Sequence, residues 1–396
     1  MNGLSQHIKI RTAYTRSINL PRDYQTLELI QAYVPTSRAI QALEQIAAGL
    51  GQQASQRALA LIGPYGSGKS AFALFLAALL SPASSPTYQA ALATLHEADP
   101  ILARQFGAER IGQQGFLRVP VSGIPDSLVR QLLLALVGVM EQQRGFTKAE
   151  VDELRAAVRP DTTLDHVVML IRRIQQLWAV MGGTGVLIEI DELGKFLEYE
   201  SYHPQHREIH LLQLLAESAH EAHAAPLHLV VLLHQGFEYY SHRLGKQLSD
   251  EWRKVQGRFN ALAFLEPAEQ SLRIISAAFE PVPSLPDKVM MPLNQWLTTL
   301  AAAETLAPGL DEASARIRFA RCYPLHPLTL LILPVLCQKI AQNERTLFSY
   351  LGSVEPFGLQ RRLAEMQWGD WIEPWELYDY FMLNEVGGVS DALTER

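Results

Sequence analysis

Residues 58 to 70 read ALALIGPYGSGKS, an apolar stretch that runs into a glycine-rich segment ending in Lys-Ser. Gly63, Gly68, Lys69 and Ser70 satisfy the pattern G-x-x-x-x-G-K-[ST]. In this pattern the loop N–H groups point at phosphate oxygens, the lysine reaches the β- and γ-phosphates, and the hydroxyl holds Mg²⁺. A chance match is the alternative, but the motif lies between a strand-like run and the apolar, helix-forming run 71–80. The residues predicted to contact a nucleoside triphosphate are Gly63, Pro64, Tyr65, Gly66, Ser67, Gly68, Lys69, Ser70 and Ala71.

A second chemically competent segment reads VLIEIDE over residues 186–192. Its apolar residues and terminal acidic pair fit a buried parallel strand that ends at the site. We expect Asp191 to complete the Mg²⁺ shell with Ser70, and Glu192 to polarise the attacking water as general base. An ordinary strand followed by an acidic turn would look the same. Strand alternation places Glu189 on the face of Asp191, either as a second carboxylate near the metal or as the partner of a Lys or Arg.

The elements that must position these residues alternate between strand and helix patterns, which predicts a parallel sheet with helices on both faces. Helical patterns cover Asp126 to Glu141 and Ile209 to His223. The strand candidates are Ala58 to Gly63, Phe116 to Val121, Val186 to Asp191, Leu227 to His234 and Ala261 to Leu265. We therefore predict an α/β fold, a three-layer αβα sandwich with a five-stranded parallel sheet. The expected divisions are an N-terminal segment 1–50, a core 51–267, a helical lid 268–350 and the start of a further helical or winged-helix module, 351–396.

Composition sets further bounds. The chain has 396 residues, 48% apolar and 19% charged, as in folded proteins with real cores, and its net charge of −7 argues against bulk polyanion binding. The two cysteines, Cys322 and Cys337, suggest neither a disulfide framework nor a metal site. No signal-peptide pattern and no run of about 18 apolar residues is present, so we expect a cytoplasmic protein without a membrane partner.

His206 and His210 lie one helical turn apart and would suit Zn²⁺, but a third well-spaced ligand is lacking.

The order of glycine-rich loop, acidic strand, polar-ended strand and the segment WRKVQGRF, 252–259, resembles the AAA+ superfamily, particularly its origin-recognition and signal-transducing branches. The resemblance implies that the strand 227–235 ends in a group that senses the γ-phosphate and orients water, either Gln235 or His234. It also implies an arginine finger that reaches into a neighbouring subunit of a homo-oligomer. Arg258 matches that position, with Arg253 as second choice, although a surface arginine at a helix end is equally ordinary.

Two further segments extend this comparison. YPLHPLT, 323–329, and QNERTLFSY, 342–350, resemble a lid in which Pro324 packs on the base and Arg345 touches the γ-phosphate, although proline at a helix start needs no more than its fixed φ. The segment 33–38, YVPTSR, lies where such ATPases cradle adenine, which assigns Tyr33 to the base. The guanine-reading element of a GTPase is not found after the core, so ATP is the expected nucleotide.

More narrowly, YVPT, GPYGSGKSAFALFLAALL, IEIDELGKFLE and YPLHPLT resemble the N-terminal part of large bacterial ATPases of DNA-modification and anti-phage gene sets. The relatives in question are the ATPase components of DNA phosphorothioation and phage-exclusion systems. The resemblance implies an ATPase that uses ATP and Mg²⁺ to drive assembly or DNA remodelling, with sulfur-transfer or nicking subunits as partners and DNA bound directly or through them. It also implies that the chain is part of a longer protein. A slow nucleotide-gated switch is the alternative function.

Overall fold

The computed structural model describes residues 3–51, 56–203, 207–240, 246–265, 268–306, 310–340 and 347–383. By its internal contacts the chain divides into two compact units. The αβ unit comprises residues 18–63 and 68–265, and the helical unit comprises residues 64–67 together with both ends of the chain, 1–17 and 266–396. The domain bounds drawn from the sequence stay predictions.

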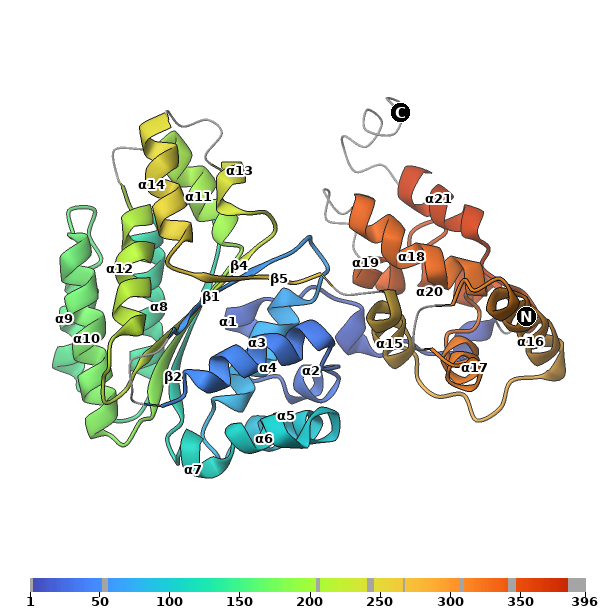
Figure 1. Ribbon diagram of the computed structural model, residues 1–396, viewed down its shortest axis with the longest axis horizontal. Coiled ribbons are helices and arrows are strands. Elements are labelled where there is room, and N and C mark those ends of the chain that lie inside the picture. Colours follow the sequence, from blue (N-terminus) through green and yellow to red (C-terminus); the bar gives the residue numbers. More distant parts are fainter. Residues whose placement is uncertain are drawn as a thin grey trace. The chain divides into compact units, whose positions relative to one another are not determined.

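The αβ unit contains a five-stranded, all-parallel sheet with helices on both faces, as the sequence predicts (Figure 1). Its strands follow the order β2-β3-β4-β1-β5. Because all strands are parallel, the carboxyl ends of β1, β3 and β4 lie at one edge of the sheet. The bounds are β1 (Ala58–Ile62), β2 (Phe116–Ser122), β3 (Gly185–Asp191), β4 (Leu227–Leu233) and β5 (Asn260–Ala263), which confirms the five predicted strands to within a residue or two at each end.

Helices cover both faces of this sheet. One face carries α4 against β3 and β4 and α1 against β2; the other carries α8, α10 and α12. The helices are α1 (Leu20–Asp23), α2 (Leu27–Gln31), α3 (Ser37–Ala48), α4 (Lys69–Leu79), α5 (Pro86–Ala98), α6 (Pro100–Gln105), α7 (Ala108–Ile111), α8 (Leu128–Gln142), α9 (Lys148–Ala156), α10 (Leu164–Val180), α11 (Leu193–Tyr202), α12 (Ile209–His220), α13 (Phe237–Tyr240) and α14 (Lys246–Gln256).

Burial explains why the central elements are mainly apolar. All seven residues of β3 and all seven of β4 are buried, as expected of strands covered on both faces. Helix α4 is apolar around its whole circumference, and nine of its eleven residues are buried between the sheet and the outer helices. On the opposite face, Val119, Leu132, Trp178 and Leu212 belong to one continuous core. The elements that carry the candidate chemistry are therefore packed within the core of the fold.

A buried arginine ties two helix ends together at the start of β1. The Arg57 guanidinium donates to the carbonyls of Gly49 and Gly51 after α3, both at 2.8 Å. It also donates to the carbonyls of Ala219, at 3.1 Å, and Glu221, at 3.0 Å, at the end of α12. Carbonyls at helix C-termini lack intrahelical donors and favour a cation, so this fork completes both ends.

We expect Arg57→Lys to lower the free energy of unfolding of the αβ unit by about 2 kcal/mol, because an ammonium cannot reproduce a planar fork that serves four carbonyls. Urea titration followed by circular dichroism measures this. Arg130→Lys is the matched control, since Arg130 forms an exposed pair with Asp126, worth less than about 1 kcal/mol. Equal unfolding midpoints for the two variants would contradict the assignment.

In the described part of the helical unit the longer elements are all helices, and the N-terminal segment of the chain packs against them. An isolated antiparallel bridge joins Ile10 to Phe279. The elements of the helical unit are the 3₁₀ turns η1 (Leu4–Gln6) and η2 (Thr12–Tyr14), and helices α15 (Ala268–Ala278), α16 (Asp287–Ala302), α17 (Glu312–Arg321), α18 (Pro327–Ile340), α19 (Leu347–Gly352), α20 (Leu359–Glu365) and α21 (Pro374–Leu383). Among the described residues, none of the helices has the length and apolar character needed to cross a membrane.

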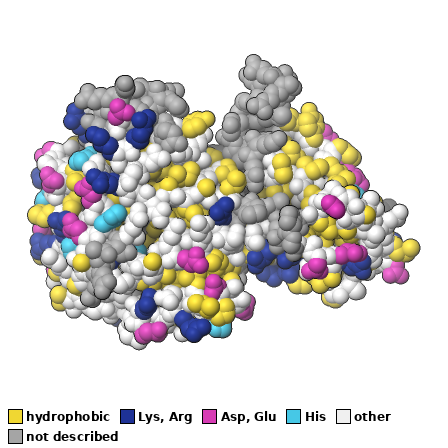
Figure 2. All heavy atoms as spheres, in the orientation of Figure 1, with side chains coloured by type: hydrophobic (Ala, Val, Ile, Leu, Met, Phe, Trp, Pro, Cys, Tyr) yellow, Lys and Arg dark blue, Asp and Glu magenta, His cyan; other side chains and the backbone are white. Residues whose placement is uncertain are grey.

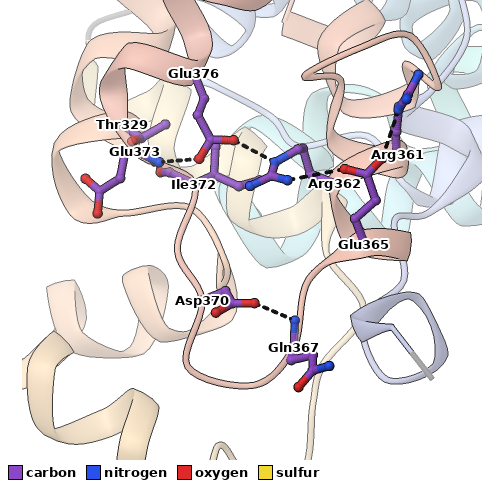
Figure 3. Close-up of polar contacts among 9 residues, drawn as sticks. All are labelled: Thr329, Arg361, Arg362, Glu365, Gln367, Asp370, Ile372, Glu373 and Glu376. Atoms are coloured by element: carbon purple, nitrogen blue, oxygen red, sulfur yellow. Dashed lines mark hydrogen bonds and ion pairs between the residues drawn. The ribbon is translucent and has the colours of Figure 1, made fainter. Parts of the chain in front are cut away.

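An ion-pair network joins α20 to α21 within the helical unit (Figure 3). Arg362 Nε donates to Glu376 Oε2 at 2.6 Å, and Arg362 Nη1 donates to Glu365 Oε2 at 3.3 Å. The other oxygen of the buried Glu376 accepts the N–H of Glu373 at 3.2 Å. The Thr329 hydroxyl on α18 donates to the carbonyl of Ile372, at 2.7 Å. These bonds fix three helices of the unit to one another.

Candidate functional site

The glycine-rich loop follows β1 directly and ends at the first turn of α4. The Gly63 N–H donates to the Leu233 carbonyl at 3.0 Å, which anchors the loop between β1 and β4. Gly68 precedes α4 with φ 90° and ψ 7°, a left-handed conformation that disfavours residues with a Cβ. The sequence therefore places a glycine where the chain must turn from strand into helix, and the positive end of the α4 dipole lies at this loop.

Lys69 is the first residue of α4, and its ammonium is nearly buried. Nζ donates to the Gly63 carbonyl at 2.5 Å, so the side chain folds back over the loop. Burial lowers the pKa of Lys69 to about 8, and the negative charges of Asp191 and Glu192 oppose that shift. The lysine of the motif and the two acidic residues, more than a hundred positions apart in the chain, thus lie within electrostatic reach of one another.

Ser70 and Asp191 are brought into direct contact. Burial raises the pKa of Asp191, and a hydrogen bond from the Ser70 hydroxyl opposes this rise. Asp191 ends β3 with 7% of its surface exposed, and its Oδ1 accepts the N–H of Glu192 at 2.8 Å. A hydroxyl and a carboxylate oxygen are hard ligands of the kind that Mg²⁺ prefers, so these two residues fit the predicted metal pair.

Glu192 has an unusual backbone conformation. Its φ of 50° and ψ of 42° lie in the left-handed region, where a non-glycine residue costs on the order of 1 kcal/mol. It is the N-cap of α11, and its Oε2 accepts from Lys195 Nζ at 2.5 Å, with 36% of the Glu192 side chain exposed. The strained turn carries the carboxylate out of the sheet, where water can reach it. Lys195 holds it there.

His234 follows β4 and lies beside this cluster. Burial lowers the pKa of His234, the charge of Lys69 lowers it further, and Glu192 opposes the shift. The ring also contacts the Tyr240 hydroxyl. Of the two residues proposed for the polar end of this strand, His234 therefore has the electrostatic link to Lys69 and Glu192. Gln235 is half-buried one residue further along, and its water-orienting role stays a prediction.

Glu189 has a partner that the sequence did not suggest. It is fully buried, and its Oε2 accepts from the Tyr24 hydroxyl at 2.6 Å. The Arg118 guanidinium carbon lies 5.4 Å from the centre of the Tyr24 ring. Burial raises the pKa of Glu189 to about 8, so the carboxyl is largely neutral at pH 7. It ties the N-terminal helices to β3 two residues before Asp191.

The remaining predicted site residues lie further from this cluster or outside it. Tyr33 stacks on Phe75 of α4, with ring centres 4.4 Å apart, so the predicted adenine side adjoins the helix that begins at Lys69. Arg258 forms a half-exposed ion pair with Glu217 at 3.1 Å. Pro324 is buried within the helical unit, where its carbonyl accepts the N–H of Ile372 at 2.9 Å. Arg345 lies outside the described residues. The intersubunit and base-packing roles stay predictions.

Within the described ranges, no group of three His, Cys, Asp or Glu side chains could hold a metal ion. His203 Nδ1 instead contacts the Tyr199 carbonyl at 2.9 Å, and the two rings stack. His206, half of the one-turn pair considered for Zn²⁺, lies outside the described residues. The Ser70–Asp191 pair is therefore the candidate metal site among the residues that the structure describes.

A buried pair of carboxyls joins the end of α11 to the start of α12. Glu200 Oε2 accepts the N–H of Glu208 at 3.0 Å, and Glu208 Oε1 accepts from the Ser127 hydroxyl at 2.6 Å. Burial raises the pKa of Glu200 from 4.5 to about 7, and the charge of Glu208 adds to the rise. Glu200 therefore binds a proton more tightly in the folded chain than in the unfolded one.

This contact predicts a pH-dependent stability. Because the folded pKa of Glu200 is the higher one, its contribution is complete below pH 4.5 and is lost as pH rises through about 7. We expect wild type to lose about 3 kcal/mol relative to Glu200→Gln between these limits, as measured by urea unfolding at a series of pH values. The exposed Glu198→Gln on the same helix is the control. A difference between Glu200→Gln and wild type that did not change with pH would refute the assignment.

Sequence reasoning missed Lys195, Tyr240, Tyr24 and Arg118. Lys195 carried a usable signal, since it stands one helical turn after Glu192. Tyr24 and Arg118 carried none, because only the fold brings them to β3. A comparison of the chain with protein-family profiles and with curated proteins finds no match.

Proposed function

We propose that this chain binds ATP with Mg²⁺ and hydrolyses it. The observation that carries the proposal is the convergence of Lys69, Ser70, Asp191 and Glu192 at the carboxyl edge of β1 and β3, with Ser70 bonded to Asp191. Ligands of open parallel sheets bind outside the carboxyl ends of the strands, and a glycine-rich loop before a helix N-terminus is suited to phosphate. The position of β4 between β1 and β3 also supports the resemblance to extra-strand P-loop ATPases.

Each residue has a role in the proposed reaction. The α4 N-terminus, the loop and Lys69 bind the β- and γ-phosphates, and Ser70 with Asp191 would hold Mg²⁺, which neutralises charge on the phosphates. Glu192 accepts the proton of the attacking water, and His234 or Gln235 orients that water. Arg258 of a neighbouring copy supplies the finger. Its exposed pair with Glu217 is inexpensive to break, since such pairs are worth at most about 1 kcal/mol.

For the biological setting we propose the ATP-driven subunit of a bacterial DNA-modification or anti-phage system, acting on DNA or on a modification complex. This part rests on the resemblance of the motifs. The alternative is a slow nucleotide-gated switch, and one observation favours it: the Lys195 ammonium is bonded to the Glu192 carboxylate, so this ion pair must open before Glu192 can activate water.

Steady-state ATP hydrolysis across a protein dilution series, with and without single- and double-stranded DNA, tests the proposal. Turnover per subunit that rises with protein concentration or with DNA supports an assembling, DNA-directed ATPase. Tight ATP binding with negligible turnover under every condition supports the switch. Absence of both binding and turnover, with the fold intact by circular dichroism, would refute the assignment of the site.

A further inference from the structure

Tyr240, the last residue of α13, forms a polar contact with the histidine at the end of β4. Its hydroxyl lies 3.0 Å from Nε2 and 3.3 Å from Nδ1 of His234, and the two rings are nearly perpendicular, at 85°. Only 7% of the Tyr240 surface is exposed. The geometry thus restrains the rotation of the imidazole.

The same hydroxyl also packs against the first turn of α11. A Cβ placed on Gly194 would lie 2.3 Å from the Tyr240 hydroxyl oxygen, so a larger residue at this position would force the tyrosine hydroxyl to move. Gly194 stands two residues after Glu192, the N-cap of the helix. Tyr240 therefore contacts both the end of β4 and the turn that presents the candidate general base.

The charges around His234 favour a neutral ring. Lys69 and Lys195 disfavour the imidazolium, Glu192 favours it, and burial disfavours it most. A neutral imidazole has one N–H donor and one acceptor nitrogen. A tyrosine hydroxyl that donates to the acceptor nitrogen selects the tautomer and leaves the other nitrogen as a donor, in the way that a hydrogen-bonded partner orients a histidine at a metal site.

We propose that Tyr240 is a positioning residue for ATP hydrolysis, which fixes the ring of His234 so that this ring and Glu192 face the γ-phosphate together. This inference rests on the proposed function. In this role Tyr240 contacts neither the nucleotide nor the attacking water. It acts through His234, which donates to the γ-phosphate or to the attacking water.

The test is Tyr240→Phe, which keeps the ring and removes only the hydroxyl. We expect kcat for ATP to fall by about tenfold, less than the hundredfold that a displacement of about 1 Å can cost, with KM changed less than about twofold. Tyr239→Phe, an exposed tyrosine one position earlier, is the matched control and should keep the wild-type kcat. In a His234→Ala background, Tyr240→Phe should cause no further loss, because its partner is gone. Additive losses, or an unchanged kcat in Tyr240→Phe alone, would overturn the inference.

A second measurement does not depend on turnover. The His234 ring titration, followed by NMR of isotopically labelled histidine, should move to higher pKa in Tyr240→Phe, because a donated hydrogen bond favours the neutral ring. Lys69, Lys195 and Glu192 act on the ring equally in both proteins. An unchanged titration would overturn the contact even if wild type proved not to hydrolyse ATP. If wild type does not hydrolyse ATP but the titration of His234 shifts in Tyr240→Phe, the contact stands and the proposed function is wrong.

Discussion

Replacement of Glu192 by Gln is expected to lower kcat for ATP hydrolysis by about 10²- to 10⁴-fold and to change ATP affinity by less than about twofold. The amide keeps the size of the side chain but cannot accept the proton of water. Because Glu192 caps α11 through its backbone and not its side chain, the fold should tolerate the change. Phosphate release under saturating MgATP measures kcat, and fluorescent-nucleotide titration measures affinity.

Glu198→Gln is the matched control, because Glu198 lies on the same helix and is exposed. It should hydrolyse ATP at the wild-type rate. Lys195→Ala adds a second comparison: if the pair with Glu192 slows turnover, its removal should raise kcat rather than lower it. Wild-type hydrolysis by Glu192→Gln would show that the general base lies elsewhere, with the acidic strand serving only the metal.

Most of the sheet could be predicted because burial leaves a direct record in the sequence. β3 and β4 are covered on both faces, so each reads as a mainly apolar run, interrupted by Glu189 in β3 and His228 in β4, that stops where the chain leaves the core. The bounds differed by only a residue or two, where the strand ends meet turns. Strand order could not be read from these runs, since β4 is as apolar as β3 and nothing local says that it lies next to β1.

The candidate site likewise has a part that could be predicted from the sequence and a part that could not. Gly68, Lys69 and Ser70 stand together in the chain because one loop and one helix N-terminus must carry them, so their spacing predicts their arrangement. The contacts that hold the site are made across the fold. Tyr24 reaches Glu189 from 165 residues away. A tyrosine in an ordinary amphipathic segment gives no sign of such a partner, because only its ring, and not its hydrogen bond, affects the pattern.

Substitution of Lys69 by Ala should have the other large effect, a loss of nucleotide binding as well as of turnover. A hydrogen bond from a charged group contributes about 1.5–3 kcal/mol, so ATP affinity should weaken by roughly 10- to 150-fold. Loss of an electrostatic group aimed at the γ-phosphate should lower kcat by about a further 10²- to 10³-fold. Calorimetry with ATP and, separately, with ADP measures how much of the lost affinity depends on the γ-phosphate, because only ATP has one.

Lys69→Arg sharpens this experiment, because it retains the charge. Lys69 is nearly buried, and its Nζ lies 2.5 Å from the Gly63 carbonyl, a contact of a compact ammonium that a larger planar guanidinium cannot reproduce. We therefore expect Lys69→Arg to lose most of the turnover that Lys69→Ala loses, whereas Lys148→Ala, an exposed lysine on α9, should leave binding and turnover unchanged. Wild-type ATP affinity in Lys69→Ala would mean that the loop does not bind the phosphates. Full activity in Lys69→Arg would mean that positive charge alone, and not the close fit of the ammonium to the loop, is what the phosphates require.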